Sequence, residues 1–328
     1  MEKSSTTTFE MNCTDNYTVS DKDLTSSNFT VTGDITVTSV TKEKVGKAMK
    51  YIITVTSGTT GGVASIKLNA GAVTDSVRNG NAVSNISEVF VKVTCDAMEE
   101  ETSTANIPVL ASNMIPVCYN STLDLWVKAD STNTSTDYPW YTYSEKKWAN
   151  AVTVTENNRN TYLNETAGIP ISMDDINTMW VWIPRFSATG DTANYNGGTK
   201  SKPGAFDITF VNKDIAAHDA FTFGEQNLSG MWIGKFENSS NITCTAGSGC
   251  NLRGIRPKIL PNVTSWRGAN VSTFFYDILN MIENGNQYGF NTSVDTKLDT
   301  HMMKNSEWGG SDILTPKYLW KMFFKYKL

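Results

Sequence analysis

The stretch KYIITVTS at residues 50–57 decides how the N-terminal part of this chain is interpreted. In it Tyr51, Ile53 and Val55 alternate with residues that point the other way, the period of a strand with one buried face. Evenly spaced strands with turn residues between them predict a β-sandwich over residues 15–97, preceded at residues 1–14 by a leader or the end of another module. Four further runs show the same alternation between Gly, Asn, Asp or Ser residues: Phe29–Val31, Ile35–Val37, Ile66–Leu68 and Val89–Val93.

Length and composition limit the class of protein. A chain of 328 residues is expected to fold as two or three domains. Its net charge is -5 and its 28 Lys and Arg residues form no basic stripe, which argues against a nucleic-acid partner. No run reaches the roughly 20 apolar residues that span a bilayer, so no membrane insertion is expected. The N-terminus shows no apolar export signal, so the chain is expected to be a fragment or to assemble on a particle such as a phage.

The distribution of tryptophan marks a boundary, because every Trp lies at position 126 or later. Residues 98–160 are expected to form a linker and a small aromatic β-region, with the acidic run Glu99–Glu101 as solvated linker. Its crowded aromatic residues suit a packed core or a sugar-stacking surface, and the core is favoured. These residues are Trp126, Trp140, Tyr141, Tyr143 and Trp148.

The five cysteines fall into two groups. Cys13, Cys95 and Cys118 are scattered and are expected to be inert thiols. Cys244 and Cys250 enclose the Gly-rich loop TAGSG, which allows the close approach of a disulfide, so a bridge and two free thiols both stay open. A zinc site is not expected, because the two histidines lie far apart in sequence and no C-x-x-C is present.

Residues 70–86, AGAVTDSVRNGNAVSNI, resemble a segment near the end of bacterial Ig-like repeats. The resemblance implies a spacer that holds another domain away from a surface. Asp75, Asn79 and Asn81 offer oxygen donors for calcium. The favoured interpretation is structural: Asn79–Gly80 forms a tight turn, and Asp75 accepts hydrogen bonds from backbone amides.

Residues 161–328 carry four landmarks in order. They are the strands MWVWIPRFS (179–187) and MWIGKFE (231–237), a helix after Trp266 in which Phe274, Ile278, Leu279 and Ile282 recur at helical spacing, and a turn or helix at Glu307–Trp308. This order resembles the formylglycine-generating-enzyme-like branch of the C-type-lectin fold. It implies an α+β domain, and the whole chain is similar to surface or phage tail proteins of gut Firmicutes.

The sequence departs from that family at its end. The family's enzymes keep a cysteine pair after the E-W motif, whereas no Cys follows Trp308, and the chain ends 20 residues later. The lectin-like domain is therefore expected to be truncated or divergent, with no catalytic residue, metal or cofactor. Two alternatives stay open: an oxidoreductase of the formylglycine-generating type whose catalytic end is missing, and a purely structural stalk component.

The favoured function is non-catalytic recognition of a cell-surface glycan or protein, at a bacterial cell surface or on a phage virion. A homo-oligomer is compatible with it. The resemblance implies that the ligand-binding residues lie on the loops from the helix to the E-W motif. They are Arg267, Tyr288, Asn291, Asn305 and Trp308. Trp308 and the other landmark tryptophan, Trp266, also suit a packed core.

Overall fold

The computed structural model describes residues 6–191, 193–199, 202, 204–240, 242 and 250–314. The chain divides into two compact units. The first comprises Met1–Cys95, Asn120–Val127 and Ala167–Ile171, and the second comprises Asp96–Tyr119, Lys128–Thr166 and Ser172–Leu328. Strands occupy 34% of the structure and helices 15%, so the prediction of a β-rich chain is confirmed, and the strands form several small antiparallel sheets. Within the described ranges, no helix has the length and apolar character to cross a membrane.

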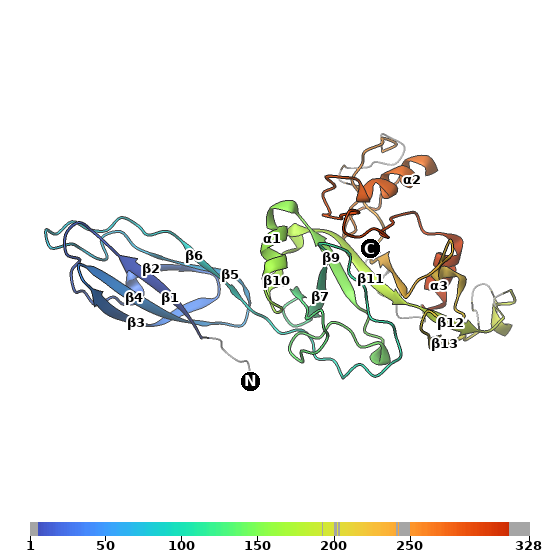
Figure 1. Cartoon of the computed structure of the whole chain (residues 1–328), viewed down its shortest axis with the longest axis horizontal. Helices are drawn as coiled ribbons and strands as arrows, with labels where there is room; N and C mark the ends of the chain where they lie inside the picture. Colours follow the sequence, from blue (N-terminus) through green and yellow to red (C-terminus); the bar gives the residue numbers. More distant parts are fainter. Residues whose placement is uncertain are drawn as a thin grey trace. The chain divides into compact units, whose positions relative to one another are not determined.

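The first unit contains two three-stranded antiparallel sheets (Figure 1). One has the order β1-β4-β3 and the other β2-β5-β6. Their bounds are β1 Thr6–Cys13, β2 Phe29–Thr32, β3 Ile35–Val45, β4 Ala48–Ser57, β5 Gly62–Leu68 and β6 Ser87–Val91, with a 3-10 turn, η1, at Ser26–Asn28. All five runs predicted from the alternation of apolar residues therefore lie in strands, although β6 ends at Val91.

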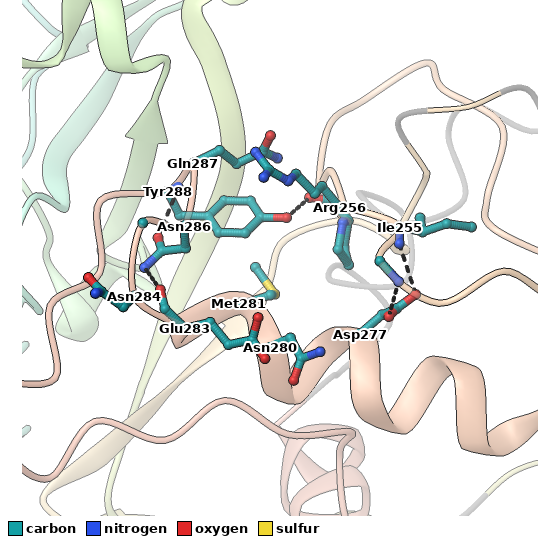
Figure 2. A pocket seen from close by; sticks show the side chains of 13 residues that line it. Ile255, Arg256, Asp277, Asn280, Met281, Glu283, Asn284, Asn286, Gln287 and Tyr288 are labelled. Carbon is teal, nitrogen blue, oxygen red and sulfur yellow. Dashed lines mark hydrogen bonds between the residues drawn. The ribbon is translucent and has the colours of Figure 1, made fainter.

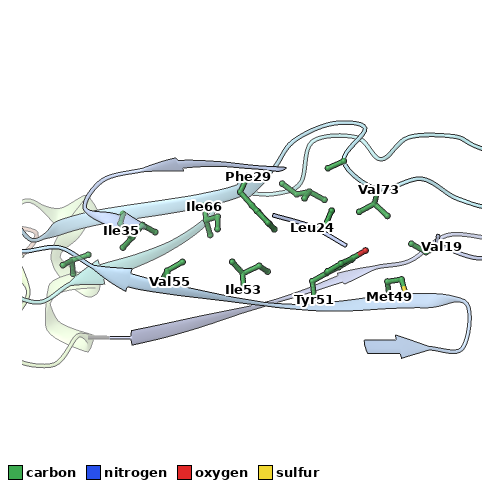
Figure 3. Packing of buried hydrophobic residues seen from close by; sticks show 14 residues of the cluster. Val19, Leu24, Phe29, Ile35, Met49, Tyr51, Ile53, Val55, Ile66 and Val73 are labelled. Carbon is green, nitrogen blue, oxygen red and sulfur yellow. The ribbon is translucent and has the colours of Figure 1, made fainter. Parts of the chain in front are cut away.

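The two sheets share one apolar core, which Figure 3 shows from the side. From β4, Tyr51, Ile53 and Val55 point toward Phe29 and Ile66 of the other sheet. Every second residue of β4 from Met49 to Val55 is buried, as a period of two requires. The buried hydroxyl end of Tyr51 is satisfied because it donates to the carbonyl oxygen of Lys22 at 2.9 Å.

Strand β1 lies in the segment that the sequence analysis assigned to a leader or a preceding module. It pairs with β4 along its whole length, from Thr6 opposite Thr56 to Cys13 opposite Met49. Phe9, Met11 and Cys13 of β1 are only partly buried against the core. Their alternation with polar residues covers only the second half of the strand, because Thr6–Thr8 before them are all polar.

A six-stranded sheet has the order β10-β8-β7-β9-β11-β16. The last three strands in this order belong to the second unit: β9 (Asn150–Val154), β11 (Ile176–Pro184) and β16 (Gly230–Gly234). The remaining strands of that sheet are β7 (Ile115–Asn120), β8 (Leu125–Lys128) and β10 (Pro170–Ile171). The landmark strand β11 pairs with β9 and β16 and is buried at eight of its nine positions. A strand that is covered on both faces has a continuous run of apolar residues in its sequence, which explains the run WVWIP at residues 180–184 of β11.

Helices and short hairpins complete the second unit. The helices are α1 (Glu156–Asn164), α2 (Val271–Leu279) and α3 (Asn305–Ile313), and the hairpins are β12 (Phe186–Thr189) with β13 (Asp207–Phe210) and β14 (Thr222–Phe223) with β15 (Gln226–Asn227). Single 3-10 turns are η2 (Tyr143–Glu145), η3 (Met173–Asp175), η4 (Tyr195–Gly197), η5 (Asp219–Phe221) and η6 (Asn280–Ile282). The helices predicted after Trp266 and at Glu307–Trp308 are confirmed as α2 and α3.

The aromatic residues of 126–148 mainly form core. Trp140 is 1% exposed, and its indole N–H donates to the carbonyl oxygen of Asn150 at 2.7 Å. Its ring stacks on Trp232 at a centroid distance of 6.4 Å, and Tyr141 and Tyr143 are also buried. The core interpretation is confirmed for these residues, while Trp126 and Trp148 are partly buried.

The acidic run at 99–101 is more than solvated linker. Glu99 and Glu100 are exposed, but the Glu101 carboxylate accepts hydrogen bonds from the backbone amides of Ser103, at 2.6 Å, and of Tyr143. The carbonyl oxygen of Glu99 also accepts a hydrogen bond from the Thr142 hydroxyl at 2.8 Å. The expectation of a purely solvated linker is therefore wrong for Glu101, which fixes this irregular segment against the aromatic core.

Candidate functional site

A polar pocket of about 180 Å³ lies in the second unit between α2 with η6 and two loop segments (Figure 2). Its walls come from residues 254–257, from Asp277 to Met281, and from residues 283–288. Residues 277–288 lie in the part of the chain where the resemblance placed the ligand-binding residues, whereas residues 254–257 precede it.

Asp277 fixes the first loop against helix α2. Its side chain is buried, and its two oxygens accept hydrogen bonds from the backbone amides of Gly254 at 2.8 Å and Ile255 at 3.1 Å. A buried carboxylate needs such donors, because an unpaired charge away from water is costly. Asp277 is thus a positioning residue that holds residues 254–257 as one wall of the pocket.

Tyr288 and Asn286 fix the opposite loop. The Tyr288 hydroxyl donates to the carbonyl oxygen of Pro257 at 2.6 Å, and burial raises its pKa, so it stays a neutral donor. The Asn286 amide donates to the carbonyl oxygens of Glu283 and Phe290, both at 2.8 Å, and accepts from the backbone amide of Tyr288 at 3.0 Å. These bonds hold residues 283–290 in one conformation without regular secondary structure.

A further constraint comes from helix α1. The guanidinium group of Arg159 donates to the carbonyl oxygens of Val154, at 3.3 Å, and Gln287. Gly289 has φ +82°, and a Cβ there would lie 2.6 Å from Nε of Arg159, so this position requires glycine. Gln287 is therefore anchored through its backbone.

The side chain of Gln287 carries an unusual feature. Its Nε2 atom is buried and has no acceptor in good hydrogen-bond geometry in the described parts of the chain, while the side chain interacts with the Tyr288 hydroxyl and counteracts the rise in its pKa. An amide nitrogen carries two N–H donors, so at least one N–H of Gln287 can pair with a group that enters the pocket. Arg256 lines the same pocket, and its positive charge acts on the Tyr288 hydroxyl.

A second candidate surface lies at the start of α3. We call it the α3 surface: Phe223, Met302, Met303, Lys304 and Trp308, all exposed. Trp308 is 47% exposed and lies one helical turn after Lys304, whose ammonium group is 3.8 Å from the centroid of the Phe223 ring. This contact joins the β14–β15 hairpin to α3 through a cation–π interaction.

Beneath this surface, His301 and Glu307 form a polar anchor. The Nε2 atom of His301 lies 3.0 Å from each carboxylate oxygen of Glu307, and its Nδ1 lies 2.5 Å from Asp299 Oδ2. The buried Glu307 also accepts a hydrogen bond from the backbone amide of Lys304 at 2.8 Å. A carboxylate that accepts from an unpaired amide in the first turn stabilises the helix start.

The five predicted ligand-binding residues do not gather at one place in the described contacts. Asn305 and Trp308 are exposed at the start of α3, and Arg267 is exposed in the loop before α2. Tyr288 is 2% exposed and lines the polar pocket as part of its frame. Asn291 is exposed, and its side chain accepts a hydrogen bond from the Ser293 amide, which closes a turn.

The two landmark tryptophans differ. Trp266 is buried, and its indole N–H donates to the carbonyl oxygen of Cys250 at 3.1 Å, so its role is packing. Trp308 is exposed despite occupying a landmark position. Of these two tryptophans, Trp308 is the one whose aromatic face is accessible to a partner.

The cysteines differ from the prediction. Cys95 and Cys118 are joined in a disulfide, so the expectation that both are inert thiols is wrong. Cys13 is a free thiol, as expected, and burial raises its pKa. Cys250 is disulfide-bonded, whereas Cys244, its predicted partner, lies outside the described residues.

The suggested calcium ligands serve the turn instead. Asp75 Oδ1 accepts hydrogen bonds from the backbone amides of Val77 at 2.9 Å and Asn79 at 2.8 Å, and Oδ2 accepts from the Asn79 side chain. Asn81 Oδ1 accepts from the Val73 amide at 2.8 Å. The structural interpretation is confirmed. In the portion that the structure describes, no group of three or more His, Cys, Asp or Glu side chains is placed to hold a metal.

The sequence did not identify most of the residues that line the pocket, among them Arg256, Asp277, Asn280, Glu283 and Gln287. One signal was available, since ENGNQYG at 283–289 is an Asn- and Gly-rich turn directly after the predicted helix. The pairing of Asp277 with two backbone amides 22 and 23 residues earlier has no local signature.

No known protein family, curated protein or solved structure matches this chain. The resemblances to Ig-like repeats and to the lectin-like fold therefore stay predictions.

Proposed function

We propose that this chain is an extracellular, non-catalytic binding protein that recognises a cell-surface glycan or protein. In this proposal the first unit is an Ig-like spacer, and the second unit is a lectin-like recognition domain. The observation that carries it is the exposure of Trp308 one helical turn after Lys304, whose ammonium group packs on the exposed Phe223 ring. Exposed aromatic and Met side chains gathered in one patch are typical of interaction sites.

The support for this surface is structural. His301 and Glu307 hold the start of α3, so Trp308 is presented from a fixed helix rather than a free loop. A rigid aromatic anchor loses little conformational entropy on binding. Extracellular placement is supported by the Cys95–Cys118 disulfide, because disulfides persist mainly in oxidising compartments.

The test is binding of the labelled full chain to a glycan array and to intact bacterial cells. We expect saturable binding to at least one target, and we expect Trp308→Ala to weaken it about thirtyfold, as loss of a hot-spot aromatic does. Tyr17→Ala is the matched control, since Tyr17 is an exposed aromatic residue of the first unit. Absence of binding by the folded chain, or equal binding by the Trp308→Ala variant, contradicts the proposal.

A further inference from the structure

The polar pocket of Figure 2 is separate from the α3 surface, and its two walls differ in chemistry. Asn280, at the start of η6, and Asn284, in the turn after it, line one wall, and the exposed Glu283 lies beside Asn284. The facing wall carries Arg256 and the buried Gln287 donor.

The charges of the pocket select against ionic ligands. An anion would meet Glu283 at the rim and the buried carboxylate of Asp277, while a cation would meet Arg256. A neutral ligand that both donates and accepts hydrogen bonds avoids both conflicts. It can donate to Glu283 and the asparagine oxygens and accept from Nε2 of Gln287.

We propose that this pocket binds a neutral, hydroxyl-rich ring, such as one terminal sugar residue of a glycan. Each hydroxyl group of a sugar is donor and acceptor at once, which matches walls of opposite hydrogen-bonding character. The volume of about 180 Å³ is below the roughly 300–1,000 Å³ of pockets for drug-sized ligands, so one ring fits rather than a chain. The frame of Asp277, Asn286 and Tyr288 holds the walls before the ligand arrives.

The test uses the full chain and saturation-transfer NMR with defined sugars. The neutral ligands are the methyl glycosides of glucose, galactose and mannose, and the charged analogues are glucuronic acid and glucosamine. We expect saturation transfer to at least one neutral glycoside, with a Kd on the order of 1 mM, as suits a small ligand. The charged analogues should bind about tenfold more weakly, because one wall opposes each charge.

Two variants assign the binding to this pocket. Gln287→Leu removes the buried donor and should weaken binding about tenfold, and Gln226→Leu makes the same change at an exposed glutamine of β15 and should leave Kd unchanged. If Gln287→Leu lowers the folded fraction seen by circular dichroism, Glu283→Ala takes its place. Glu283 is exposed, and its loss should weaken binding about fivefold without affecting folding.

Three outcomes overturn the inference: no saturation transfer to any neutral glycoside, equal affinity for the charged analogues, or unchanged affinity in a folded Gln287→Leu or Glu283→Ala variant. The Trp308→Ala variant separates this site from the proposed function. It should keep monosaccharide binding while losing target binding through the α3 surface, so either proposal can fail alone.

Discussion

The ammonium group of Lys235 lies inside the second unit. It donates to the side-chain oxygen of Asn150 at 2.7 Å, and burial lowers its pKa to about 8. In the unfolded chain the same group titrates near 10.4. Between these two values the unfolded chain holds a proton that the folded chain has released, so the free energy of unfolding rises with pH.

Replacing Lys235 by Met should remove this dependence while keeping the length of the side chain. The difference in pKa corresponds to about 3 kcal/mol. As the pH rises from below 8 to about 10.5, the free energy of unfolding of the wild-type protein should therefore increase by about that amount relative to the variant. Urea unfolding of both proteins at matched pH measures the difference, and tyrosine ionisation cancels because both proteins share it. Parallel curves across this range would contradict the assignment.

At the scale of single elements, the start of α3 depends on one carboxylate. Glu307 accepts from the Lys304 amide and faces Nε2 of His301, and it is buried. Glu307→Ala removes these partners and leaves the first-turn amide unpaired. We expect the opening free energy of α3 to fall by about 1–2 kcal/mol, seen as roughly 5–30-fold faster hydrogen exchange of residues 305–313.

The control for α3 is Glu225→Ala, which removes an exposed glutamate from the tip of the β14–β15 hairpin. Exchange in α3 should be unchanged in this variant. Faster exchange in both variants would point to a general loss of stability. Equal protection in wild type and Glu307→Ala would show that packing alone holds the helix.

Elements with a strong local period were predictable from the sequence, and contacts between distant segments were not. The alternation through Tyr51, Ile53 and Val55 and the helical spacing from Phe274 to Ile282 fix a strand and a helix, because each pattern reports one buried face. The Asp75 turn was predictable for the same reason, since its partners are two and four residues away.

The candidate site could not be predicted from such local patterns. Tyr288 lines the polar pocket, but its buried position depends on a bond to Pro257, 31 residues earlier. Whether Trp308 packs or is exposed depends on which neighbours cover α3, and residue type does not decide it. Strand β1 was missed because its apolar residues are confined to Phe9, Met11 and Cys13, which are only partly buried, and the rest of the strand is polar.

At the scale of the whole molecule, the Cys95–Cys118 disulfide closes a long irregular stretch of chain. Within it, β7 is the only strand, and the segment before β7 is held mainly by side-chain bonds such as those of Glu101. A bridge across a loop of this length stabilises by roughly 3 kcal/mol when it mainly restricts the unfolded chain. The bond therefore stabilises a stretch that carries little secondary structure of its own.

The double variant Cys95→Ser, Cys118→Ser should accordingly lower the free energy of unfolding by roughly 3 kcal/mol and expose residues 96–114 to limited proteolysis. Cys13→Ser is the control, because Cys13 is a free, half-buried thiol whose replacement breaks no bridge. Mild reduction of the wild-type protein should reproduce the double variant. If neither treatment changes unfolding or cleavage, the hydrogen bonds of Glu101 and the indole bonds of Trp182 and Trp232 are sufficient to hold this segment.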